Sequence, residues 1–138
     1  MIAFRYSTVI ILVIMSFSVF ADKPDLSEKR IYNSKFFDIF ISDVNCQDPG
    51  DCSHVQAVII DKREKKKINA SGETINIGFG RNLRGYVMYG NQYRFEIRQP
   101  ETKLDEHVDL SKWSISVDVK NQNGTYENIF KDVGEMSY

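Results

Sequence analysis

Hydrophobic and polar side chains alternate along most of the chain after residue 34, and this period of two is typical of β-strands. The clearest pattern lies in residues 84–98, where Gly90-Asn91 separates two runs rich in aromatic and β-branched residues. Because glycine at the first central position of a two-residue loop tolerates a positive φ, we expect Gly90-Asn91 to form a hairpin turn. The hairpin offers one apolar face, which the rest of the chain must cover.

The same pattern predicts seven or eight short strands and no long amphipathic helix. Expected strands cover residues 35–44, 54–60, 68–70, 74–77, 84–89, 92–98, 113–120 and 125–130. Residues 71–73 are interpreted as a break between two short strands, and only residues 102–112 could hold a helical turn. This pattern predicts an all-β, mostly antiparallel fold, either a two-sheet sandwich or a small barrel, with the strand order left open.

An apolar run at the start of the chain indicates export. Residues 8–20 are almost wholly apolar, follow Arg5, and lead to small residues suited to cleavage after Ala21. A signal anchor is the alternative, but the run is shorter than the roughly 20 residues that span a bilayer. We therefore expect a periplasmic or secreted protein, bacterial by composition, whose mature chain has no integral membrane segment.

Four segments are expected along the chain. They are a signal peptide (1–21), a flexible lead-in (22–34) in which residues 31–32 could form a short strand, a single β-domain (35–133) and a frayed tail (134–138). The 138 residues carry 18 basic and 19 acidic side chains, a formal net charge of −1. That balance argues against nucleic-acid binding, which needs a basic surface.

The only two cysteines, Cys46 and Cys52, are expected to form a disulfide, because an isolated pair in an exported protein usually does. The Asp-Pro-Gly-Asp turn between them can bring their Cα atoms within bridging distance. A metal-binding or redox pair is the alternative, but the spacing is not Cys-x-x-Cys. The nearby oxygen-bearing side chains could hold calcium or could simply cap their own turn; they are Asp43, Asn45, Asp48 and Asp51.

Catalytic motifs are absent from the sequence. The two histidines, His54 and His107, have no metal-ligand spacing, and His107, Asp109 and Ser111 are not singled out as a triad by their context. We expect no enzyme activity, no cofactor and no bound metal, with a secreted enzyme kept as a minor alternative.

Arginine and tyrosine gather around the glycine-rich stretch 78–85 and the hairpin that follows it. The stretch lacks the Lys-Ser/Thr of a phosphate loop and leads into a strand. Tyrosine and arginine are favoured at binding hot spots. The candidate binding residues are Arg81, Arg84, Tyr86, Tyr89, Tyr93 and Arg94. The alternative for these residues is a sheet surface without a partner, in which the tyrosines shield the sheet and the arginines are solvated. A separate candidate is the basic patch at residues 62–67, which could contact anionic lipid.

Size, export and the lack of catalytic motifs favour a protein that acts by binding. We expect an inhibitor or immunity protein that blocks an envelope enzyme or toxin, for example a cell-wall hydrolase, by inserting an arginine-bearing loop. The alternative is a glycan-binding or adhesin-type subunit whose tyrosines stack on sugar rings. Such a subunit could assemble into an oligomer. The partner is therefore another protein or, in the alternative, a glycan.

Overall fold

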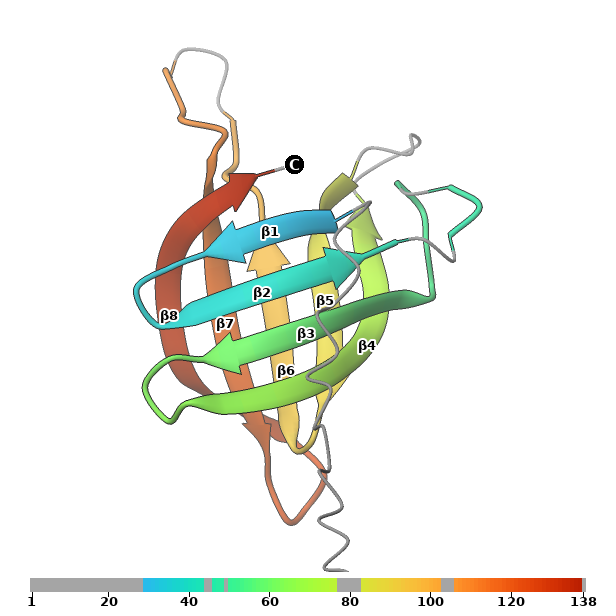
Figure 1. The fold of residues 1–138 in the computed structure, drawn as a ribbon, viewed down its shortest axis with the longest axis vertical. Helices are drawn as coiled ribbons and strands as arrows, with labels where there is room; N and C mark the ends of the chain where they lie inside the picture. The colour runs from blue at the N-terminus through green and yellow to red at the C-terminus, as the bar shows by residue number, and fades with distance from the viewer. Residues whose placement is uncertain (1–28, 44–45, 49, 77–82, 103–105, 138) are drawn as a thin grey trace, which may run out of the picture.

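Eight antiparallel strands close into a barrel in the computed structural model, which describes residues 29–137 apart from 44–45, 49, 77–82 and 103–105 (Figure 1). The strands are β1 (Lys29–Asn33), β2 (Phe37–Ser42), β3 (Val55–Asp61), β4 (Lys66–Asn76), β5 (Leu83–Gly90), β6 (Tyr93–Arg98), β7 (Lys112–Lys120) and β8 (Tyr126–Ser137). Each strand pairs with the next, and β8 pairs with β1. The all-β antiparallel prediction is confirmed, and of the two expected architectures the barrel is the one adopted. The predicted signal peptide at residues 1–21 falls outside the described residues.

The predicted alternation places apolar side chains inside the barrel. On β7, Trp113, Ile115 and Val117 are buried, while the side chains between them face outward. The same holds on β2 for Phe37, Ile39 and Ile41, as the pattern predicts. A single core cluster draws on all eight strands.

The barrel is built from two layers that cross. Figure 1 shows β1–β4 running across the view in front and β5–β8 running nearly vertically behind them. At one corner β4 bends from the front layer to the back, and Gly72 lies within it. A Cβ at Gly72 would lie 2.8 Å from Met88 Cα, so only glycine permits this approach of β4 to β5. The break expected at 71–73 is therefore wrong, because this glycine bends the strand without ending it.

At the opposite corner, β1 pairs with β8, the first and last of the described strands. The short strand that residues 31–32 could form is present and extends over Lys29–Asn33 as β1. Residues 134–137, which were expected to fray, belong to β8, so that prediction needs correction. Tyr32 is fully buried, and a Cβ at Gly134 would lie 2.7 Å from its ring. These two strands stabilise each other across more than 100 residues of sequence, and a local pattern does not carry that information.

The main hairpin turns one residue later than expected. Gly90 is the last residue of β5, and the positive φ of 55° belongs to Asn91. A Cβ at Gly90 would lie 2.6 Å from Asn69 O and 2.8 Å from the side chain of Ile68. Gly90 therefore allows β5 to pack closely against β4. Asn91 adopts the left-handed turn conformation, which asparagine tolerates.

The connections divide unequally between the two ends of the barrel. One end, here the short-loop end, carries the connections 34–36, 62–65, 91–92 and 121–125. The other, the long-loop end, carries connections 43–54, 77–82 and 99–111, together with the start of β1 and the end of β8. Because long loops on a rigid scaffold commonly carry function, the long-loop end is the first place to look for a site.

Candidate functional site

The predicted disulfide between Cys46 and Cys52 is confirmed, with their Cα atoms 5.5 Å apart. It lies in the connection between β2 and β3 at the long-loop end. Cys52 and Thr74 tie this loop to β4, because Cys52 N donates to the side-chain Oγ1 of Thr74 and Thr74 N donates to Cys52 O, each at 2.9 Å. The loop is therefore fixed to the barrel at its second cysteine.

The acidic side chains near the disulfide do not gather around a common point. Asp48 Oδ1 accepts a hydrogen bond from Gly50 N at 2.9 Å, which is turn chemistry. Within the described ranges, no three His, Cys, Asp or Glu side chains come close enough to hold a metal ion together. Asn45 lies outside the described residues.

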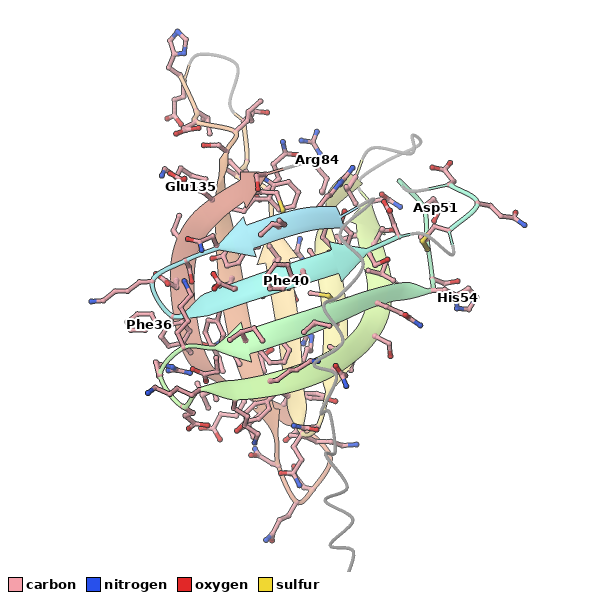
Figure 2. The ribbon with its side chains drawn as sticks, viewed as in Figure 1. Phe36, Phe40, Asp51, His54, Arg84 and Glu135 are labelled. Atoms are coloured by element: carbon pink, nitrogen blue, oxygen red, sulfur yellow. A yellow bond between two sulfur atoms is a disulfide. The ribbon has the colours of Figure 1, made fainter. Side chains whose placement is uncertain are left out.

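Two arginines line a cleft at the long-loop end. Arg84 is the second residue of β5 and Arg98 is the last residue of β6, and they share a cavity of about 270 Å³ with residues 99–102. Gln99 N donates to Arg84 O at 2.8 Å, which holds the start of the long β6–β7 connection beside Arg84. Figure 2 shows Arg84 at the upper end of the barrel, above β1. This cleft brings two guanidinium groups to the end that carries the long loops.

The guanidinium of Arg84 is incompletely paired. Its Nε is buried and has no hydrogen-bond partner among the residues that the structure describes. Arg98 Nε donates to Glu96 on the outer wall, so Arg98 is already part of an ion pair. Glu101 lines the cleft too and contributes negative charge. Arg84 is therefore the cation in this cleft that is best placed to bind an acidic group of another molecule.

The other candidate residues do not form one surface with Arg84, and Arg81 lies outside the described residues. Tyr86 is fully buried, so its prediction as a surface binding residue needs correction. Its ring stacks on Trp113 with centroids 6.5 Å apart, and its hydroxyl accepts a hydrogen bond from Arg30 at 2.6 Å. The alternation required Tyr86 and Tyr89 to face opposite ways, and the structure assigns Tyr86 to the interior.

Tyr89 and Arg94 lie on the outer wall. Tyr89 is 46% exposed. Arg94 pairs with Glu96 at 2.6 Å and with Asp118 at 3.5 Å, so its charge is balanced within the wall. Of these two residues, Tyr89 is the one that offers a surface to a partner.

Tyr93 lies at the short-loop end, where it lines a second cavity of about 270 Å³ together with Arg63. The Arg63 guanidinium lies 4.6 Å from the ring centre of Phe130 and 5.0 Å from that of Phe37, and it pairs with Asp61 at 3.0 Å. Residues 62–67, read as a possible lipid-binding patch, thus include an arginine committed to the barrel. In the sequence, only Asp61, two residues before Arg63, indicates that this arginine forms an ion pair within the barrel.

The histidines take no part in a catalytic arrangement within the described structure. Figure 2 shows His54 projecting beside the disulfide loop, away from the barrel. Ser111 donates to Asp109 through both its N–H and its hydroxyl, at 3.0 and 2.7 Å. These two bonds lower the pKa of Asp109. They close a local turn, and His107 is exposed.

Comparisons with known proteins do not assign this chain to a protein family, so the structure alone defines its fold class. No family model, no curated protein and no solved structure matches this chain. Among the described residues, no helix is long and apolar enough to cross a membrane. The molecule is a small closed antiparallel β-barrel with a disulfide at its long-loop end. Such a bond is compatible with an oxidising compartment such as the periplasm or the extracellular space.

Proposed function

We propose that this protein is an exported inhibitor or immunity protein that binds an envelope enzyme or toxin through its long-loop end. The single observation that carries the proposal is the cleft lined by Arg84 and Arg98 at that end. Its guanidinium groups suit a carboxylate, because arginine and carboxylate form short, charge-assisted and often bidentate hydrogen bonds.

The chemistry of a cell-wall glycosidase fits this cleft. Such enzymes commonly use a pair of carboxylates, and one that is held by an arginine can no longer act as acid, base or nucleophile. Arg84 lines the cleft, and its buried Nε has no hydrogen-bond partner among the described residues, which supports a guanidinium that is not fully committed inside the barrel. Contact of this guanidinium with a catalytic carboxylate would block the enzyme.

Two described segments of the long-loop end are held to the barrel before any partner binds. The disulfide closes the β2–β3 loop, and the bonds between Cys52 and Thr74 tie that loop to β4. Gln99 is held against Arg84 in the same way. A surface that is ordered before binding loses little conformational freedom on binding, which favours affinity.

Affinity capture from an envelope extract tests this proposal. The immobilised mature protein is expected to retain a hydrolase or a toxin, identified by mass spectrometry and then assayed for inhibition. The Arg84→Glu variant should lose this capture, because it places a negative charge opposite the target carboxylate. Lys120→Glu reverses a charge at the short-loop end and serves as the matched control. Capture of no hydrolase or toxin by the wild-type protein would overturn the proposal.

A further inference from the structure

A third hollow lies on the outer wall of the barrel, away from the arginine cleft and from the cavity beside Tyr93. It has a volume of about 380 Å³ and is lined by residues 53–56 and 71–72 and by Tyr89. Its floor follows one row of paired residues across three strands, since Gln56 is opposite Ser71 and Ser71 is opposite Tyr89. The small serine between two larger side chains creates the trough.

The lining of this groove is polar and includes no Asp, Glu, Lys or Arg side chain. Its side chains include the hydroxyls of Ser53 and Ser71, the amide of Gln56 and the imidazole of His54. Within the described part of the chain, the side chains of Gln56 and Ser71 make no hydrogen bond to another protein group. They are therefore free to donate to and accept from a ligand that carries hydroxyl groups.

Tyr89 adds an aromatic surface to the groove. Its side chain is almost half exposed, and the ring of Tyr126 lies 6.0 Å away, centre to centre. An exposed aromatic ring beside neutral hydrogen-bonding groups offers an apolar face together with directed polar contacts. The sugar ring has the same combination, with one face of C–H groups and a rim of hydroxyls.

We propose that this groove binds a neutral oligosaccharide, with a sugar ring stacked on Tyr89 and its hydroxyls bonded to Gln56 and Ser71. The site goes beyond the proposed inhibitory function and does not depend on it, because Arg84 lines a different cavity. The absence of a charged carboxylate or amine in the groove favours a neutral ligand over an anionic one, because a buried charge would lack a partner.

Titration followed by two-dimensional NMR of the folded protein tests this inference. Chitotetraose and maltotetraose serve as neutral probes, and tetragalacturonate serves as the anionic one. At least one neutral probe should shift the backbone amide signals of residues 53–56, 71–72 and 89, and tetragalacturonate should shift them less. The inference is overturned if neither neutral probe shifts these signals at millimolar concentration, if shifts occur only elsewhere, or if the anionic probe binds as well.

Variants separate a stacking role from a general effect on the fold. Tyr89→Ala should weaken binding at least about tenfold, the loss typical of removing a binding hot spot. Ser71→Trp fills the trough from the outer face and should abolish binding. Ile129→Ala, which shortens an exposed side chain on β8, should leave affinity unchanged. Thermal unfolding identifies any variant that fails to fold, and a folded Tyr89→Ala with wild-type affinity would refute the stacking contact.

Discussion

Replacing Asp61 by asparagine tests whether the ion pair at the short-loop end holds that end of the barrel together. Asp61 is only 7% exposed. Its carboxylate accepts hydrogen bonds from Arg63 Nε at 3.2 Å and Nη2 at 3.0 Å. It also accepts from the backbone N–H groups of Arg63 and Glu64. Asparagine removes the charge and turns one acceptor into a donor that faces the guanidinium.

The cost of this substitution can be worked from the contacts. Breaking a buried ion pair by removing one partner costs about 3–5 kcal/mol. The Arg63 side chain is 40% exposed, so solvent screens the charge that is left behind and lowers that figure to about 2 kcal/mol. Loosening the guanidinium from the rings of Phe37 and Phe130 adds about 0.5 kcal/mol. We expect the free energy of unfolding to fall by about 2–3 kcal/mol at pH 7.

The pH dependence of stability gives a second readout. Burial opposes ionisation of Asp61, but the hydrogen bonds and positive charge of Arg63 together outweigh it and hold the pKa of Asp61 below its ordinary value. A carboxyl group whose pKa is depressed by folding stabilises the protein above its unfolded pKa. That contribution is lost as the pH falls below about 4 and through the folded pKa. Asp61→Asn should remove this part of the acid sensitivity.

Urea unfolding at pH 7 and pH 3 measures both effects. Asp38→Asn is the matched control, because Asp38 pairs with Lys62 at 2.9 Å but is 28% exposed, and we expect it to cost less than about 1 kcal/mol. The reasoning is refuted if Asp61→Asn unfolds within about 0.5 kcal/mol of the wild type at pH 7 and loses the same stability between pH 7 and pH 3.

Two further substitutions test the corner glycine and the disulfide. Gly72→Ala should destabilise the barrel by about 3 kcal/mol or more, because its Cβ would lie 2.8 Å from backbone atoms of β5. Gly124→Ala should cost only about 1 kcal/mol, since Gly124 has a φ of 85° but open space around it; equal costs in thermal unfolding would contradict the corner role. Replacing Cys46 and Cys52 together by serine should cost about 2 kcal/mol or less and leave the β-sheet circular dichroism unchanged, and a collapsed spectrum would argue against a local role.

The class and the inward faces of the strands could be predicted because both follow from local alternation. Trp113, Ile115 and Val117 face the core as their spacing indicates. The choice of a closed barrel over a two-sheet sandwich could not be predicted, because closure depends on the pairing of β1 with β8, whose residues lie far apart in the sequence. Gly72 was misread for a related reason, since a glycine that bends a strand and one that ends it look alike in sequence.

The candidate site was only partly predictable. The residue type of Arg84 and its place beside a glycine-rich stretch predict a binding role, and the structure puts Arg84 in a cleft. Arg94 and Tyr86 are predicted on the same grounds, yet one is paired in the wall and the other is buried. Residue type and strand parity do not show which charges find partners, because those partners come from neighbouring strands.

The central claim is that Arg84 meets an acidic group of a protein target, and the affinity of the captured hydrolase or toxin for charge-reversed variants measures it most directly. The account predicts that Arg84→Glu weakens binding by about 100-fold or more, because truncated or reversed pairs of desolvated charges cost several kcal/mol. Lys120→Glu should bind within about threefold of the wild type, the loss expected of a charge far from the contact. Equal affinity of wild type and Arg84→Glu would contradict the account.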